Sequence, residues 1–501
     1  MVDSTETKED DIRSHFNFDN SYARSLESFF KFCQAEPAVA PQMLQFNHAL
    51  AEELGLDPLA LDSDAGLAIF SGNIAPKGSE PLAQAYAGHQ FGGFSPQLGD
   101  GRALLLGEVI DTQQRRRDIQ LKGSGRTPFS RGGDGKAAIG PVLREYLIGE
   151  GMHALGVPTT RALAAVSTGN NVYREHLLPG AILTRVAASH IRVGTFQYGS
   201  ARGDEGKVRE LADYAIKRHY PDTADAENPY LAFFDAVSDA QASLVARWMN
   251  IGFIHGVMNT DNMTISGETI DYGPCAFMDN YAQGTVYSSI DQYGRYAYAN
   301  QPVILSWNLT RLAETLVRFV DPDKDKAIEI LTDRVERIQP LYEKYWLAGM
   351  RSKIGLTTED PLDQELINDL LEVMEKGHAD FTLVFRRLSH VLRGDSDAVR
   401  QLFEEPGAFD AWAKRWRERL EQDGVATETN AQAMDRVNPI YIPRNHKVEE
   451  ALAAATDQQD MQPFSKLLAV ISHPFDEIAG KEAYTEPAPE TNIPYRTFCG
   501  T

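Results

Sequence analysis

Residues 255–262 read HGVMNTDN, and the tripeptide DYG begins at Asp271. Between these stretches, the dipeptide Ser266-Gly267 suits a two-residue turn and is flanked by short runs rich in Ile and Thr. We therefore expect a β-hairpin over residues 263–270. Its register, counted back from the turn, would place Asn262 opposite Asp271 with their β-carbons about 5 Å apart.

The paired amide and carboxylate predict a metal site. Asn262 and Asp271 can share one hard divalent cation such as Mg²⁺, whose other positions are filled by water and phosphate oxygens. Asp261 would then lie on the acceptor side, as a base that takes a hydroxyl proton. An ordinary polar hairpin, in which Asp and Asn cap turns, explains the same residues if the hairpin stands alone.

The chain upstream of this hairpin is rich in strand-type sequence. Glycine-rich residues 86–169 contain three such runs, at residues 102–110, 118–122 and 161–167. A helical pattern at residues 137–155, with its apolar residues on one face, lies between the last two. Strands with one helix pressed against them predict a small α+β unit.

Lys122 and Glu145 are placed where such a unit could hold a phosphate. Lys122 ends the second strand on the same face as Gln120, and Glu145 lies at the margin of the apolar stripe of the helix. The Glu145 carboxylate can reach back and hold the Lys122 ammonium against a phosphate. Taken singly, both are more simply surface residues, and only the order of glycines, strand lysine and helix glutamate favours a nucleotide site.

Glycines and arginines supply further candidate nucleotide contacts. Glycine before a strand lets backbone amides approach a phosphate, although it more often only makes a turn. Arginine forks fit phosphate oxygens, although each could pair instead with one of the many carboxylates. A glycine-rich turn before a helix can lie along a nucleotide or simply cap the helix. The residues concerned are Gly99, Gly101, Arg102, Asp134, Gly135, Arg185 and Arg192.

Composition limits the class of protein. The 501 residues include 71 acidic and 49 basic side chains, a formal charge of -22, which should repel nucleic acid phosphates and anionic membranes. The sequence has no apolar run of about 18 residues, and its start does not resemble a secretion signal. We therefore expect a cytoplasmic monomer without nucleic-acid or membrane partners.

Helical patterns dominate the chain after residue 206, which predicts an α+β fold of two lobes. The first lobe is rich in strands, the second is mostly helical, and the ligand cleft lies between them. We divide the chain into an N-terminal extension that wraps the first lobe (1–85), the strand-rich lobe (86–205), the core of the helical lobe (206–310) and a helical C-terminal region (311–501).

Four motifs resemble the selenoprotein O family of kinase-like protein adenylyltransferases. They are YAGHQFG at residues 86–92, QLKGSG at 120–125, SHIRVG at 189–194 and the stretch from 255 to 273. The resemblance implies a two-lobed protein-kinase-like fold with added N- and C-terminal helical elements. It implies that Asp261 is the proton acceptor, Asn262 and Asp271 the metal ligands, and Glu145 the ion-pair partner of Lys122. The nucleotide contacts that it implies are Gly99, Gly101, Arg102, Lys122, Asp134, Gly135, Arg185, Arg192 and Asp271.

One position departs from ordinary protein kinases. Those enzymes carry a catalytic Asp two residues after the His of the loop, where this chain has Val257. In the resembling family ATP is thought to bind turned end for end, so that AMP moves to a Ser, Thr or Tyr hydroxyl of a protein. Bacterial members are also credited with moving UMP in the presence of Mn²⁺. The expected cofactor is therefore Mg²⁺ or Mn²⁺, with ATP or UTP as co-substrate.

Two other functions stay open. A small-molecule phosphotransferase resembling aminoglycoside or choline kinases would share the lobe layout and a His-Gly loop, but those families also keep an Asp where Val257 stands. An inactive nucleotide-binding scaffold would have to retain a full set of chemically competent residues without using them, namely Lys122, Glu145, Asp261, Asn262 and Asp271.

The three cysteines are too few for a disulfide framework or a paired zinc site. Cys33 ends an aromatic run, residues 29–33, that we interpret as a core helix. The resemblance to bacterial family members implies a redox-sensitive disulfide between Cys275 and Cys499. Two unrelated thiols are the alternative, which cytoplasmic chemistry favours.

Overall fold

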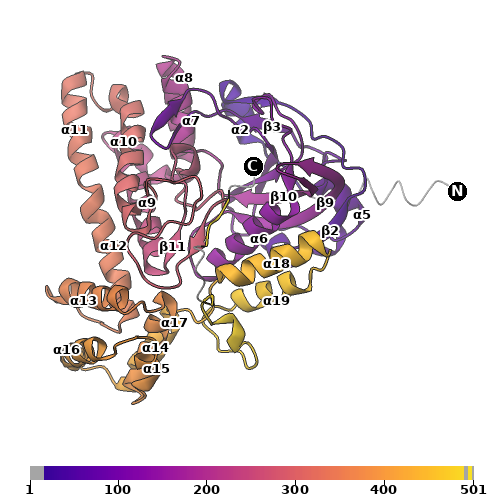
Figure 1. Ribbon diagram of the computed structural model, residues 1–501. Helices are drawn as coiled ribbons and strands as arrows, with labels where there is room; N and C mark the ends of the chain where they lie inside the picture. The colour runs from indigo at the N-terminus through magenta and orange to yellow at the C-terminus, as the bar shows by residue number, and fades with distance from the viewer. Residues whose placement is uncertain (1–15, 490–494, 499–501) are drawn as a thin grey trace.

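The computed structural model describes residues 16–489 and 495–498 and combines an antiparallel sheet with many helices (Figure 1). The mixed α and β composition predicted from the sequence is therefore confirmed. The sheet has eight strands in the path order β1-β3-β6-β7-β10-β9-β2, with β8 paired to β10. Their bounds are β1 Phe30–Phe32, β2 Gln42–Phe46, β3 Leu82–Gln84, β6 Ala103–Ile110, β7 Arg116–Lys122, β8 Ala137–Ala138, β9 Arg161–Tyr173 and β10 Leu177–Ala187.

The centre of the sheet is formed by strands whose residues are buried on both faces. Leu104, Leu106 and Leu121 pack into one apolar cluster, whereas Leu105 and Leu183 belong to another. Such continuous apolar runs read clearly as strands, and the three strands predicted at 102–110, 118–122 and 161–167 are confirmed as β6, β7 and the first half of β9.

Helix α6, Ile139–Ala154, packs against β9 and β10 and confirms the helix predicted at residues 137–155. Its stripe residues Val142, Leu143 and Leu147 are buried in the larger apolar cluster. The C-terminal helices α18, Asn445–Asp457, and α19, Gln462–Ile471, run beside α6 on the side away from the sheet (Figure 1). Helix α6 therefore lies between the sheet and the helices α18 and α19.

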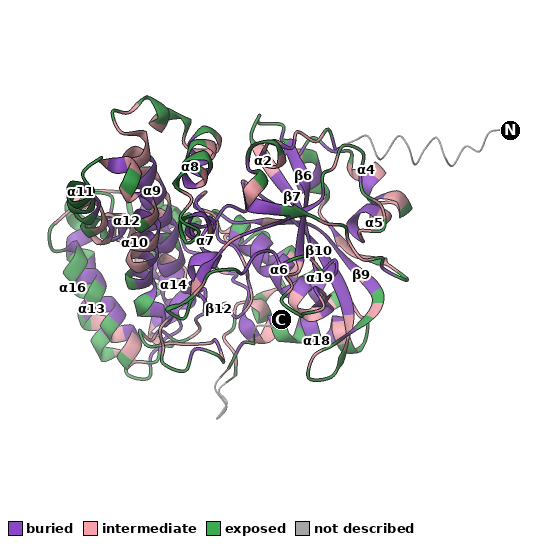
Figure 2. Cartoon of the chain, turned by 90° about the horizontal axis from the view of Figure 1, so that it is seen from above, coloured by how far each residue is buried: buried purple, intermediate pink, exposed green. Residues whose placement is uncertain are grey.

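The rest of the chain is mostly helical. Figure 2 shows buried residues concentrated in the sheet and along α9 and α10, while α13 and α16 expose much of their surface. No helix within the described ranges is long and apolar enough to cross a membrane. The helices are α7 Val193–Ser200, α8 Glu205–His219, α9 Pro229–Asn250, α10 Gln301–Val320, α11 Lys324–Glu336, α12 Ile338–Lys353, α13 Asp363–Lys376, α14 Phe381–Leu392, α15 Asp397–Arg400, α16 Gly407–Asp423 and α17 Thr427–Val437.

The hairpin predicted over residues 263–270 is wrong. Thr264 makes an isolated bridge to Arg192 and Thr269 makes another to Thr159, so the two arms pair with different neighbours instead of each other. The turn is closed by a side chain, because the Thr264 hydroxyl accepts from the Glu268 backbone N–H (3.1 Å) and donates to the Glu268 carbonyl (2.7 Å). The predicted register between Asn262 and Asp271 has no basis, and their relation must come from tertiary structure.

The segment before Tyr86, which the sequence predicted as an extension around the first lobe, supplies strands to the sheet. β1 pairs with β3, and β2 pairs with β9, so this segment forms both edges of the sheet. The core helix predicted at residues 29–33 is wrong, because Phe30–Phe32 is the strand β1 and Phe32 is 62% exposed. Cys33 follows this strand, half-buried against the sheet.

Candidate functional site

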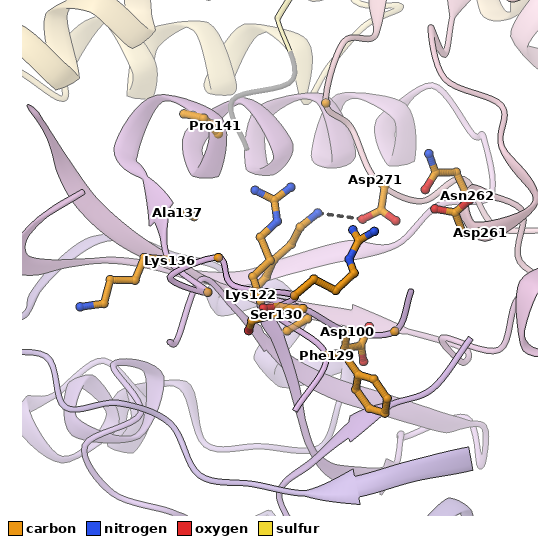
Figure 3. A pocket seen from close by; sticks show the side chains of 18 of the residues that line it. Asp100, Lys122, Phe129, Ser130, Lys136, Ala137, Pro141, Asp261, Asn262 and Asp271 are labelled. Carbon is orange, nitrogen blue, oxygen red and sulfur yellow. Dashed lines mark hydrogen bonds and ion pairs between the residues drawn. The ribbon is translucent and has the colours of Figure 1, made fainter. Parts of the chain in front are cut away.

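A pocket with a volume of about 810 Å³ opens between the sheet and the loop that follows β11, Phe253–Ile254 (Figure 3). It contains all of the residues expected at the site from the sequence except the two cysteines. These lining residues are Gly99, Gly101, Arg102, Lys122, Asp134, Gly135, Glu145, Arg185, Arg192, Asp261, Asn262 and Asp271.

Asp271 is the centre of a charged cluster in this pocket. Its Oδ1 lies 2.7 Å from the Lys122 ammonium and 2.7 Å from the Arg185 guanidinium, and its Oδ2 lies 2.8 Å from Arg192. Glu145 joins the cluster from α6, with its carboxylate 2.6 Å from Lys122 and 3.1 Å from Arg185. Three cations therefore converge on two carboxylates at the wall of the pocket.

Strand pairing explains how these groups meet. Lys122 ends β7, and the adjacent strand β10 places Arg185 opposite Gln120 in the register. Arg185 donates to the Gln120 side-chain oxygen through two nitrogens, at 2.7 and 3.2 Å, which fixes the plane of its guanidinium. Since Gln120 and Lys122 lie on one face of the strand, the lysine and the arginine point to the same carboxylates.

The cations keep the acidic groups of the cluster ionised. Burial pushes the pKa of Asp271 upward, but the charges of Lys122, Arg185 and Arg192 outweigh it and hold that pKa well below its usual range. The same balance, with Lys122 and Arg185, lowers the pKa of Glu145. The Asp271 and Glu145 carboxylates at the wall of the pocket are therefore ionised at neutral pH.

Asp261 has a different environment. It lies in the short helical turn η3, Thr260–Asn262, and its side chain is buried. Its Oδ2 accepts from the Gln90 amide at 3.1 Å, whereas its Oδ1 has no hydrogen-bond partner within the described residues. Burial raises its pKa to about 6, against the opposing effects of Gln90 and Arg192. A carboxylate with one unsatisfied oxygen and an increased proton affinity suits the work of a general base.

Asn262 and Asp271 could supply oxygen ligands to a hard metal ion. The Asn262 amide nitrogen donates to the Val257 carbonyl at 2.9 Å, which leaves its side-chain oxygen for another partner. Both side chains line the pocket, and Figure 3 shows them next to Asp261. Among the described residues no group of three or more His, Cys, Asp and Glu side chains could hold a metal. A site of one carboxylate, one amide oxygen and phosphate oxygens is the kind that Mg²⁺ accepts, because it keeps several waters.

Two glycines at the pocket are required by close packing. Gly99 has a φ of +78°, and a β-carbon there would lie 2.4 Å from the Phe129 ring. Gly135 has a φ of +68°, and its β-carbon would lie 2.0 Å from the Gly125 carbonyl oxygen. Neighbouring Asp134 is held by Arg174 at 2.9 Å, so it shapes the loop in addition to lining the pocket.

We did not predict four polar residues of this pocket and its walls. Asp100, buried between Gly99 and Gly101, accepts from the Gln120 side chain at 3.2 Å. Tyr86 lies with its ring under the Arg192 guanidinium, 4.5 Å from its centre. Gln90 holds Asp261. Two signals in the sequence could have found three of these residues. Tyr86 and Gln90 belong to the motif at residues 86–92, and strand alternation puts Gln120 on the same face as Lys122.

Cys275 is buried two residues after the DYG tripeptide. The preceding residue, Pro274, accepts a hydrogen bond from the Thr497 hydroxyl at 2.7 Å, which places the end of the chain beside this segment. Cys499 lies outside the described residues, so its pairing with Cys275 stays a prediction.

Known proteins resemble the chain over nearly its whole length. The sequence model of the family described as protein adenylyltransferase SelO matches residues 13–472. A protein nucleotidyltransferase YdiU of Cereibacter sphaeroides is 61% identical over 488 residues, which cover 97% of this chain and 100% of the relative. The YdiU proteins of Rhizobium meliloti and Rhizobium rhizogenes are both 58% identical, over 97% of this chain and 99% and 97% of their own lengths.

Proposed function

Since the chain belongs to the protein adenylyltransferase SelO family, we propose that it transfers AMP from ATP to Ser, Thr or Tyr hydroxyls of proteins and releases pyrophosphate. The family expected from the four motifs, and the class of enzyme with it, are confirmed by these matches. The observation that carries the proposal is the Asp261 carboxylate, which lines the same pocket as Lys122, Arg185 and Arg192 and has one buried oxygen, Oδ1, without a hydrogen-bond partner among the described residues.

The three cations bind the triphosphate in this proposal. Arginine forks and a lysine ammonium match phosphate oxygens, and an ATP carries more negative charge than the two carboxylates it would meet. The cations are already paired and buried, so little reorganisation is needed when charge develops on the leaving group. Asp271 can exchange part of its contact with them for a metal ion.

Asp261 takes the proton in the transfer step. The O–H bond of the acceptor breaks towards the Asp261 carboxylate, and the hydroxyl oxygen forms a bond to the α-phosphorus. The bond from the α-phosphorus to the bridging oxygen breaks, and its electron pair leaves with pyrophosphate. Kinases use an Asp two residues after the loop His for this purpose, and Val257 at that position is apolar. This favours ATP turned end for end, with the α-phosphate towards Asp261.

Asn262 and Asp271 would hold Mg²⁺ or Mn²⁺. When bound, the ion would neutralise phosphate charge and make pyrophosphate a better leaving group. UTP, with transfer of UMP, is the alternative donor. The preference for ATP over UTP in this proposal follows the description of the family as protein adenylyltransferases.

The arrangement of the sheet, the pocket and the helices supports a two-lobed protein-kinase-like fold. In this proposal the divisions at residues 85, 205 and 310 separate the extension, the two lobes and the C-terminal region. A cytoplasmic monomer acting on protein partners, without nucleic acid, is part of the same proposal. So is the Cys275–Cys499 disulfide, which the contact between Thr497 and Pro274 supports.

The experiment that tests this function uses ATP labelled at either the α- or the γ-phosphorus. The reduced protein is incubated with Mg²⁺ or Mn²⁺, and label retained on protein is measured after removal of nucleotide. Label from α-labelled ATP alone is the expected result. Label from γ-labelled ATP alone would make the protein a kinase, and label from neither, with an acceptor protein present, would favour a small-molecule phosphotransferase or an inactive scaffold.

A further inference from the structure

A small hairpin covers the loop that carries Asp261. It consists of β4, Gly88–Gln90, and β5, Gly93–Ser95, joined by the two residues Phe91 and Gly92. Both joining residues have positive φ, +51° and +85°, as in the type I′ turns that match the twist of a tight hairpin. A bulky residue rarely adopts such a backbone conformation, so further contacts must hold Phe91 in place.

Those contacts all lead to the loop of Asp261. The Phe91 backbone N–H donates to the Asn259 side-chain oxygen at 3.1 Å, and the Tyr296 hydroxyl donates to the same oxygen at 2.6 Å. The His89 backbone N–H donates to the Thr260 hydroxyl at 2.7 Å. The strained turn is therefore fastened to the two residues that precede Asp261.

Gln197 of α7 ties the hairpin and the loop together. Its side-chain oxygen accepts from the Thr260 hydroxyl at 2.6 Å, and its amide nitrogen lies 2.8 Å from the His89 ring. The Thr260 hydroxyl thus accepts a hydrogen bond from His89 and donates one to Gln197. These hydrogen bonds fix the position of the hairpin relative to the loop that carries Asp261.

Two hairpin residues touch Asp261 itself. The Gln90 amide nitrogen lies 3.1 Å from Oδ2. A β-carbon on Gly88 would lie 2.5 Å from Oδ1 and 2.9 Å from the carboxyl carbon, so only glycine leaves room for the carboxylate. One residue orients the group and the other provides the space for it.

We propose that this hairpin positions Asp261 for catalysis, with Gln90 as the positioning residue that holds Oδ2 and so fixes the orientation of the carboxylate relative to the acceptor hydroxyl. The proposal rests on the function proposed above, in which Asp261 takes the hydroxyl proton. The terminal torsion of an Asp side chain is broad, so without a donor on one oxygen the carboxylate samples many orientations. A base must lie within hydrogen-bond reach of the proton that it removes, and small misplacements reduce the rate strongly.

The first test replaces Gln90. Gln90→Ala removes the donor, and Gln90→Glu keeps the shape but places a second carboxylate against Asp261. We expect kcat for transfer of labelled AMP to fall about 10- to 100-fold in Gln90→Ala and at least as far in Gln90→Glu. The KM for ATP and the melting temperature should stay near those of the parent, because neither variant alters the cation cluster. Gln97→Ala, at an exposed glutamine that contacts Arg202, is the matched control and should keep the parental kcat.

The second test uses two glycines of the same hairpin. Gly88→Ala should lower kcat at least as much as Gln90→Ala, since the added carbon displaces the Asp261 carboxylate. Gly93→Ala should not, because its β-carbon would meet only the Gln90 carbonyl oxygen, at an ordinary 3.5 Å. Equal effects of the two alanines would overturn the proposal, since they would indicate a general dependence on the fold of the hairpin.

Asp261→Asn separates this proposal from the proposed function. If it abolishes transfer while both Gln90 variants keep kcat within about twofold of the parent, the positioning role is wrong and the base assignment stands. If Asp261→Asn itself keeps the parental kcat, the base assignment is wrong, and the hairpin proposal fails with it. A Gln90 variant in which KM for ATP, kcat and melting temperature all change together would assign Gln90 a structural role only, against our proposal.

Discussion

Asp271 and Asp118 are both carboxylates paired with arginine, and both are tied to strand β7. Asp118 lies within the strand and accepts from the backbone N–H (3.0 Å) and the ring (2.9 Å) of His190 and from Arg218 of α8. Asp271 contacts Lys122 at the end of the strand, together with Arg185 and Arg192. The Asp118 side chain is wholly buried, whereas that of Asp271 is 20% exposed and lines the pocket.

The difference teaches that access, more than composition, separates a structural ion cluster from a ligand site. Around Asp118 every carboxylate oxygen is bound from within the protein, and the cluster joins the sheet to α8. Around Asp271 the cations line a cavity of about 810 Å³, from which a ligand can reach them. The first cluster should therefore control stability and the second should control activity.

Asp271→Ala provides the largest contrast. Without this carboxylate the proposed metal ion loses its only anionic protein ligand, and such an ion contributes several kcal/mol to a charged transition state. We expect the rate of AMP transfer to fall at least about 10³-fold. The rate is measured with α-labelled ATP in Mg²⁺ and again in Mn²⁺. Transfer that persisted in either metal would show that Asp271 is not the metal ligand.

Asp118→Ala should have the opposite profile. The change leaves Arg218, which is 4% exposed, without its closest carboxylate and with the more distant Glu108 at 3.4 Å. Breaking a buried pair costs about 3–5 kcal/mol of the free energy of unfolding, and we expect the lower end of this range. We expect a clear fall in denaturation midpoint, measured by circular dichroism, with activity per folded molecule close to that of the parent. Asp118→Asn, which keeps the shape, is the milder control. A large loss of activity without a change in midpoint would remove the distinction between the two clusters.

The sequence predicted the parts of this architecture that depend on local pattern. Strands β6, β7 and β9 and helix α6 follow from apolar runs and helical spacing. The edge strands β1 and β2 did not, because their partners lie about 50 and 120 residues away in sequence and no local signal specifies such pairing. The hairpin at 263–270 failed for a related reason, since Thr264 and Thr269 find better partners in Arg192 and Thr159.

The site shows the same division. The order of glycines, Lys122 and Glu145 suggested which residues meet, and the pocket contains them all. The sequence did not indicate that Asp271 binds three cations at once, because Lys122, Arg185 and Arg192 come from β7, β10 and the N-cap of α7, and only the tertiary structure brings these elements to Asp271. Gln90 was part of a recognised motif, but its contact with Asp261 spans 171 residues of sequence and needed the structure.

Stabilisation by bound nucleotide should also distinguish the Asp271 cluster from the Asp118 cluster, with a smaller change in free energy than the substitutions above. A ligand that binds only the folded protein, present at 100 times its Kd, stabilises it by about 2.7 kcal/mol. We expect ATP with Mg²⁺ to raise the melting temperature of the parent and of Asp118→Asn to a similar extent, but to raise that of Asp271→Ala much less. Differential scanning fluorimetry measures these shifts. An equal shift in Asp271→Ala would mean that ATP binds without the metal ligand or at another site.

The smallest effect that we expect is a pH dependence of the unfolding free energy, which arises in the cluster around Asp118. Burial lowers the pKa of His190 to about 4, with Arg185 and Arg192 acting in the same direction and Asp118 opposing them. Between pH 6.5 and pH 4 the unfolded chain therefore binds a proton at this residue that the folded chain does not, so its contribution to stability falls as the pH falls. One pKa unit corresponds to about 1.4 kcal/mol, so we expect a loss of about 1 kcal/mol between pH 6.5 and 5.5.

His190→Gln should flatten this part of the profile of unfolding free energy, whereas His176→Gln, at an exposed position, should leave it unchanged. Parallel profiles for the parent and His190→Gln would mean that the Asp118 cluster accommodates a charged imidazole, and would weaken the contrast between the two clusters.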